Sequence, residues 1–202
     1  MDAYTKEEQQ IEVIRQWFLN IAKPACISVI IGVSSFYGWF YLQAEQEVSR
    51  EQASEVYTQV VIALGAGDAK AEQKASSFIS EHDGEIYASL VSLHLAKSFI
   101  KENKLVEAGK QLRAVQSEKN EILTPIATMR LARVEIELNN LDIALQELDK
   151  ITVESWTAQV EELRGDIKRQ KGDNATARSA YLASIAAASN PVVQMKLHNL
   201  SQ

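Results

Sequence analysis

A repeated register of small and large residues is the feature that most narrows the folds open to this chain. In three stretches a small residue is followed twelve positions later by an alanine, and four positions further by a large residue. The three sets are Ala96, Ala108 and Leu112; Ala132, Ala144 and Leu148; and Gly165, Ala177 and Tyr181. Successive sets are offset by 36 and 33 residues, close to the period of about 34 residues at which the paired helices of tetratricopeptide solenoids repeat. The register predicts an all-α, tetratricopeptide-like helical-repeat solenoid, with a generic helical bundle as the alternative.

The same register places a turn inside each repeat, four positions before the alanine. The turns are Asn103-Lys104, Asn139-Asn140 and Gly172-Asp173. Asn and Gly tolerate the left-handed backbone conformation that ends many helices, so each first helix is expected to stop there. Eight glycines and three prolines in 202 residues agree with a helical protein that has few tight turns.

Both ends of the array depart from this register. Residues 53–79 are interpreted as a degenerate first repeat, in which a helical stripe precedes a longer turn. The stripe comprises Tyr57, Val60, Val61 and Leu64, and the turn comprises Gly65, Gly67 and Asp68. The tail predicts a terminal helix that covers the open face of the last repeat. Its apolar residues are Val192, Val193, Met195, Leu197 and Leu200.

A charge-free run precedes the repeats. The 21 residues from Pro24 to Ala44 carry no charge, and as a helix they would reach roughly 31 Å, the thickness of the hydrocarbon layer of a bilayer. Aromatic rings between Phe36 and Tyr41 are typical of a membrane interface. The run is longer than the roughly 10–14 apolar residues of a buried core helix. The sequence therefore predicts a single N-terminal transmembrane helix at residues 24–42.

Three details refine this prediction. Small residues lie on one face of the helix, where a neighbouring membrane helix would approach closely; they are Ser28, Gly32 and Ser35. A cleaved signal peptide is the rival interpretation, but Leu42 is too large for the minus-three position of a cleavage site before Glu45. Before the run, residues 11–21 predict either a small amphipathic helix on the headgroups or a continuation of the transmembrane helix.

Basic residues beside the run set its orientation. Lys6, Arg15 and Lys23 precede it, and only Arg50 lies in the next twenty positions, so the N-terminus is expected to stay in the cytoplasm. The single thiol, Cys26, lies within the run, and a large domain without cysteine suits an oxidising compartment. The expected segments are a cytoplasmic tail (1–23), the transmembrane helix (24–42) and a non-cytoplasmic repeat domain (43–202).

Composition excludes several functional classes. The chain has 21 Lys and Arg against 27 Asp and Glu, with a net charge of -6 and a pI near 5.2, which argues against a nucleic-acid partner. Three scattered histidines, His82, His94 and His198, have no nucleophile at a recognisable spacing. The acids Glu161-Glu162 and Glu135 with Glu137 are interpreted as solvated or ion-paired residues on exposed helix faces. The sequence predicts a non-enzyme without catalytic residues, cofactor or metal.

Several segments resemble the YfgM family and follow the same order along nearly the whole chain. They are Gly38–Tyr41, Met129–Val134, Leu163–Asp166, Lys171–Asp173, Ala177–Tyr181 and Gln194–Leu200. The resemblance implies a single-pass protein of the bacterial inner membrane with a cytoplasmic N-terminus and a periplasmic tetratricopeptide-like domain. It supplies no catalytic residues.

The resemblance also implies a function and partners. Members of the family are ancillary subunits of the SecYEG translocon that associate with the periplasmic chaperone PpiD and help secreted polypeptides leave the channel. A secondary role, restraint of the response regulator RcsB, is implied as well. The expected function is therefore a membrane-anchored protein-interaction adaptor between the channel and a PpiD-like chaperone during protein export. The alternative is a membrane-tethered scaffold for envelope assembly or signalling that does not contact the translocon.

Overall fold

The computed structural model describes residues 15, 17, 32–34, 36–37 and 53–200. The chain divides into two compact units, residues 1–52 and 53–202. In the first unit the few described residues are helical and exposed, Gly32 among them. Ser28, Ser35 and most of the predicted span at 24–42 lie outside the described residues. Among the residues that are described, no helix combines the length and the apolar character needed to cross a bilayer.

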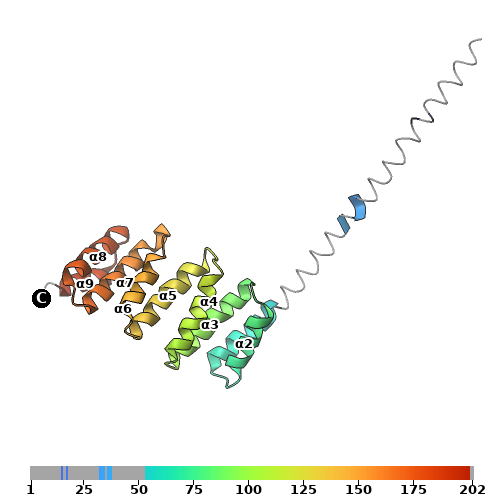
Figure 1. Cartoon of the computed structure of the whole chain (residues 1–202), viewed down its shortest axis with the longest axis horizontal. Coiled ribbons are helices and arrows are strands. Elements are labelled where there is room, and N and C mark those ends of the chain that lie inside the picture. The colour runs from blue at the N-terminus through green and yellow to red at the C-terminus, as the bar shows by residue number, and fades with distance from the viewer. Residues whose placement is uncertain (1–14, 16, 18–31, 35, 38–52, 201–202) are drawn as a thin grey trace, which may run out of the picture. The chain divides into compact units, whose positions relative to one another are not determined.

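The second unit is built from helices that follow one another in chain order (Figure 1). Its first helix covers residues 53–66. The others are α2 (Ala71–Glu81), α3 (Ile86–Lys101), α4 (Leu105–Ser117), α5 (Leu123–Glu137), α6 (Leu141–Asp149), the 3-10 helix η1 (Glu154–Trp156), α7 (Thr157–Gln170), α8 (Asn174–Ala187) and α9 (Pro191–Asn199). Helices α3 and α4, α5 and α6, and α7 and α8 form antiparallel pairs, and α4 packs on α5 to join successive pairs. The fold is a tetratricopeptide-like solenoid.

The repeated small and large residues lie in the interior of these pairs. All nine are buried. The small residues Ala96, Ala132 and Gly165 lie on α3, α5 and α7, and the other six lie on α4, α6 and α8. Gly165 packs directly against the Tyr181 ring, and a Cβ atom at position 165 would lie 2.5 Å from two ring carbons. The close approach of α7 and α8 therefore depends on the absence of a side chain at Gly165.

Each pair uses the same turn. Asn103, Asn139 and Gly172 have φ values of 60°, 61° and 79°, as the sequence predicts. In each case the next residue donates its backbone N–H to the carbonyl five residues back: Lys104 to Phe99, Asn140 to Glu135 and Asp173 to Lys168, at 2.8 to 2.9 Å. This is the Schellman motif, which satisfies the free carbonyls at a helix C-terminus.

The first pair carries this turn as well. Gly67 has a φ of 70°, and the N–H of Asp68 donates to the carbonyl of Ala63 at 3.1 Å. Helix α2 begins four residues after Gly67, whereas α4 begins two residues after Asn103. The first repeat therefore has the longer turn that the sequence indicates, on an otherwise standard helix ending.

At the other end, α9 closes the array. Asn190 caps its N-terminus by accepting the N–H of Val192 at 2.9 Å, and Pro191 occupies the first turn. Val193 is fully buried against α8, in a cluster with Tyr181, as expected for a terminal helix. Leu197 and Leu200 pack against the same cluster, whereas Val192 and Met195 are more than half exposed, so three of the five apolar residues of the tail cover the last repeat.

The expectation that Glu135 lies on an exposed face is also wrong. Glu135 is 2% exposed, and its carboxylate accepts Arg113 Nη2 at 2.5 Å and Asn140 Nδ2 at 2.8 Å. Glu137, two positions later on α5, is exposed. Arg113 lies on α4, 22 residues away, so the i+4 neighbours of Glu135 gave no sign of this partner.

Candidate binding clefts

Two clefts open between the first helices of successive repeats. The α3–α5 cleft has a volume of about 560 Å³ and the α5–α7 cleft about 600 Å³. Arg133 and Glu137 line both, so α5 forms their common wall. Most lining residues of both clefts come from α3, α5 and α7, so this is the face that the first helices present to solvent. Solenoids use such extended surfaces for binding.

The repeat register determines which residues line the clefts. The position directly after the small residue carries Lys97 on α3, Arg133 on α5 and Asp166 on α7. The small residue must face the partner helix, so the next position is turned toward the cleft. The same position on the repeated frame is therefore cationic in two repeats and anionic in the third.

The α3–α5 cleft combines cations with an apolar floor. Lys97, Arg130 and Arg133 line it, and Glu137 is the one carboxylate among its described lining residues. Its apolar lining comprises Leu93, Ala96, Ile100, Leu105, Leu112 and Val134. The Ile100 side chain is 41% exposed within this lining, so a large apolar group is accessible to a ligand.

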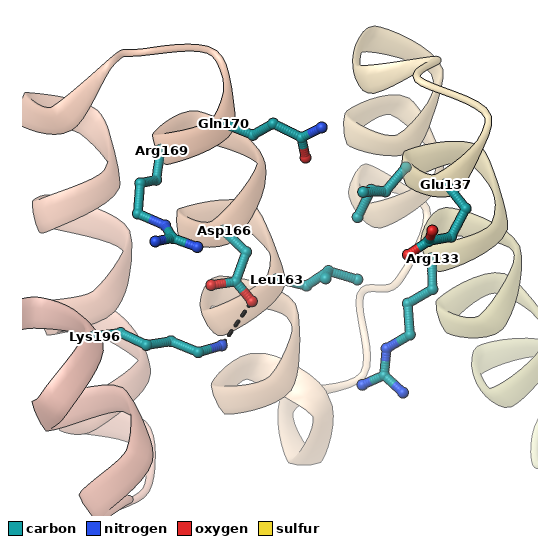
Figure 2. A pocket seen from close by; sticks show the side chains of 8 residues that line it. Arg133, Glu137, Leu163, Asp166, Arg169, Gln170 and Lys196 are labelled. Carbon is teal, nitrogen blue, oxygen red and sulfur yellow. Dashed lines mark hydrogen bonds and ion pairs between the residues drawn. The ribbon is translucent and has the colours of Figure 1, made fainter.

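In the α5–α7 cleft, by contrast, one of the lining cations, Lys196, is paired with acids. Figure 2 shows Lys196 of α9 reaching Asp166 of α7. The ion pair measures 2.7 Å, and Lys196 also contacts Glu162 at 2.8 Å. Tyr181 donates its hydroxyl proton to the other Asp166 oxygen at 2.8 Å. Burial opposes the charged form of Lys196, but its hydrogen bonds to Asp166 and Glu162 outweigh this and raise its pKa. This network holds α7, α8 and α9 together.

His94 lies beside the cationic residues of the first cleft. It is half-buried on α3, and its Nε2 atom is 3.5 Å from the hydroxyl of Tyr57. Burial lowers the pKa of His94, and the nearby charges of Lys97 and Arg130 lower it further. These effects favour the neutral form of the imidazole, which agrees with a packed repeat position.

A smaller cleft of about 190 Å³ lies between helix 53–66 and α3, and its lining includes His94, Lys97 and Lys101. The exposed cations therefore extend from Arg130 and Arg133 on α5, across Lys97 and Lys101 on α3, toward the first repeat. Among the described residues, no group of three or more His, Cys, Asp or Glu side chains is arranged to hold a metal ion. The chemistry that these clefts offer is recognition through charge and apolar contact.

The sequence predicted the helices that form this face but not the charged residues that line its clefts. Of the nine repeat-packing residues, Ala96 and Leu112 form part of the α3–α5 floor, and the other seven line neither cleft. The functional candidates Lys97, Arg130 and Arg133 were missed. The available signal was their place in the register, because positions 97 and 133 both follow the small residue of their repeat.

Known proteins resemble the whole chain. A family model described as a tetratricopeptide repeat-like domain matches residues 15–202. The ancillary SecYEG translocon subunit of Escherichia coli strain K12 is 35% identical over 206 aligned residues, covering 100% of both chains. Proteins of the same name from Aggregatibacter actinomycetemcomitans and Haemophilus influenzae are each 29% identical, covering 98% and 96% of this chain and 100% and 98% of their own lengths.

Proposed function

The chain belongs to the YfgM family of tetratricopeptide repeat-like proteins, and from this premise we propose that it is an ancillary subunit of the Sec translocon. In this role it is a membrane-anchored adaptor that links the channel to a PpiD-like periplasmic chaperone and assists emerging secreted polypeptides. A secondary contact with RcsB, on the cytoplasmic side, is part of the same proposal. The role is binding and not catalysis.

One observation carries the proposal. The relative named ancillary SecYEG translocon subunit aligns with this chain from end to end, so the similarity extends through the charge-free run as well as the repeats. A likeness restricted to the repeats would support only a generic protein-binding solenoid, because this fold serves many functions.

The proposed location follows from the N-terminal sequence. Residues 24–42 form the single membrane anchor, since the uncharged run is long enough to span a bilayer. Lys6, Arg15 and Lys23 keep the N-terminus in the cytoplasm and place residues 43–202 in the periplasm. The small residues Ser28, Gly32 and Ser35 are the proposed contact of this anchor with a translocon helix.

The clefts support the adaptor role of the repeat domain. They lie side by side on one face and are lined by charged and apolar residues together, as in interfaces that recognise polypeptides. We therefore assign the chaperone or the emerging chain to this face and the channel to the membrane helix.

Purification of the full chain in a mild detergent, followed by mass spectrometry of its partners, tests the proposal. Recovery of SecY together with a PpiD-like chaperone is the expected result. Recovery of envelope-assembly or signalling proteins without any SecYEG subunit would instead favour the tethered scaffold. A control chain with an unrelated transmembrane helix and the same expression level identifies adventitious membrane partners.

Two variants test the division of labour between the segments. Replacing residues 24–42 by an unrelated hydrophobic span should weaken SecY recovery while chaperone recovery persists. Removing residues 53–202 should have the reverse effect. If one of these changes abolished both contacts and the other changed neither, the division would be wrong even though the translocon association itself stood.

A further inference from the structure

The face formed by the first helices carries a set of cations that form no ion pair with any described carboxylate. Lys97 and Lys101 lie on α3, and Arg130 and Arg133 lie on α5; all four side chains are exposed. Within the part of the chain that the structure describes, none of these four forms an ion pair, whereas Lys104, Lys150, Lys171 and Lys196 all do. The whole chain has a net charge of -6, so this concentration of positive charge runs against the overall balance.

Like charges are held close together here. Lys97 on α3 and Arg130 on α5 line the same cleft. Burial lowers the pKa of His94 most, and these two cations both lower it further. Holding several cations around one groove costs repulsion that an anionic ligand would relieve. Structural ion pairing does not explain the arrangement: Glu102 and Glu72 pair with Lys104, and Glu135 pairs with Arg113. Glu137, the one carboxylate among the described lining residues, forms no ion pair with the three cations of the cleft.

The cations surround an apolar cleft and not a flat surface. Leu93 and Val134 form part of its buried lining, and the partly exposed Ile100 lies between Lys97 and Lys101 along α3. The volume of about 560 Å³ is sufficient for one or two large side chains. A ligand that fills this cleft therefore needs both negative charge and a large apolar group.

We propose that the α3–α5 cleft binds an acidic polypeptide segment that inserts a large apolar side chain beside Ile100 while its carboxylates contact Lys97, Arg130 and Arg133. The inference rests on the proposed function in that it gives the chemistry of the partner of the repeat domain. An acidic segment fits better than an anionic membrane surface, because a recessed apolar floor accepts single side chains and a planar headgroup layer would meet only the rim.

The neighbouring α5–α7 cleft has a different selectivity. There Asp166 and Glu162 already pair with Lys196, so an acidic ligand gains less from this cation than from the unpaired Lys97 and Arg130 of the first cleft. The two clefts lie on either side of α5 and share Arg133. Because their other charges differ, the acidic segment is assigned to the α3–α5 cleft, and the α5–α7 cleft is left to a ligand of different charge.

Fluorescence anisotropy with the full chain in a mild detergent tests the proposal. The probe is a short labelled peptide in which Glu and Asp alternate with Leu, and its matched control has Gln and Asn in place of the acids. We expect the acidic peptide to bind and its affinity to fall as salt is raised. The control peptide should bind at least about tenfold more weakly, since charge-assisted hydrogen bonds are stronger than neutral ones.

Matched variants locate the site. Lys97→Gln/Arg130→Gln should weaken the acidic peptide by about tenfold or more, whereas Lys110→Gln/Lys119→Gln, on and just after α4, removes the same charge and should leave binding unchanged. Ile100→Ser should weaken both peptides, because it removes apolar contact. All of these side chains are exposed, and circular dichroism melting checks that each variant keeps the wild-type fold.

Several results would overturn the inference: equal binding of the two peptides, equal loss in the two double variants, or displacement of the peptide by phosphatidylglycerol with no effect of Ile100→Ser, which would indicate a lipid surface. Its failure is distinguishable from failure of the proposed function. Loss of peptide specificity with SecY still recovered rejects only the cleft assignment. If the chain binds the acidic peptide specifically but SecY never co-purifies with it, the translocon role is rejected and the cleft assignment stands.

Discussion

At the scale of single residues, Gly165 shows why one position of the repeat must be small. The Tyr181 ring fills the space where its Cβ atom would lie, and Tyr181 is fully buried and hydrogen-bonded to Asp166. The ring therefore cannot move aside without breaking that hydrogen bond. The α7 backbone approaches α8 closely because position 165 has no side chain.

Gly165→Ala should therefore destabilise the domain by about 1–3 kcal/mol, although alanine normally favours a helix. Gly65→Ala, in helix 53–66, is the matched control, since Gly65 is exposed and a new Cβ there would meet no atom within 4 Å. That change should be neutral or stabilising by up to about 1 kcal/mol. Urea unfolding followed by circular dichroism measures both. Equal destabilisation by the two changes would show that the Tyr181 contact is not the cause.

His94 gives the domain a pH dependence. Burial, followed by Lys97 and Arg130, lowers its pKa below the ordinary value of 6.5, so the unfolded chain binds this proton more readily than the folded chain. Its contribution to stability is fully present above pH 6.5 and is lost as the pH falls below that value. Urea unfolding at a series of pH values should show this decline, and His94→Gln should reduce it. An identical decline in the variant would assign the effect to another group.

At the scale of elements, the helix pairs are alike in their endings and in their packing. Four first helices end in a left-handed residue, at Gly67, Asn103, Asn139 and Gly172, and the second helices of the last three pairs pack through an alanine of zero exposed fraction. Since the same contact recurs in each pair, a change at one alanine tests the register of the whole array.

Ala144→Leu should lower the stability of the domain by about 1–3 kcal/mol, because Ala144 is completely buried between α5 and α6 and the added atoms have no space. The same change at Ala69, which is exposed in the turn before α2, should have little effect. Thermal melting of the two variants provides the comparison. If Ala69→Leu lowered the melting temperature as much as Ala144→Leu, position 144 would not be the close contact that the register indicates.

At the scale of the whole molecule, the proposed topology makes a labelling prediction. In a Cys26→Ser background, new cysteines are introduced singly at Gln10 and Gln159. An impermeant maleimide added to intact spheroplasts should label only position 159, which the structure places on the exposed surface of α7. Labelling at position 10 without labelling at 159 would reverse the orientation, and permeabilised cells serve as the control for reactivity at both positions.

The helical frame of the repeat domain followed from the sequence by itself. The spacing of Ala96, Ala132 and Gly165 and the turns at Asn103 and Gly172 are local patterns, because helix periodicity and the left-handed tolerance of Asn and Gly act within a few residues. Such local patterns can be recognised in a single sequence. They determined the helix pairs, the order of the repeats and the terminal helix.

The tertiary structure alone decided which charges are buried, which are paired and which remain free. Glu135 is buried because Arg113, 22 residues away, reaches it across α4 and α5, and Glu147 is buried where Gln116 donates to it from 31 residues away. Lys97 and Arg130 share one cleft only because successive first helices pack side by side. Electrostatic contacts depend on distance in space, and helical periodicity along the chain does not report the distance between side chains on different helices.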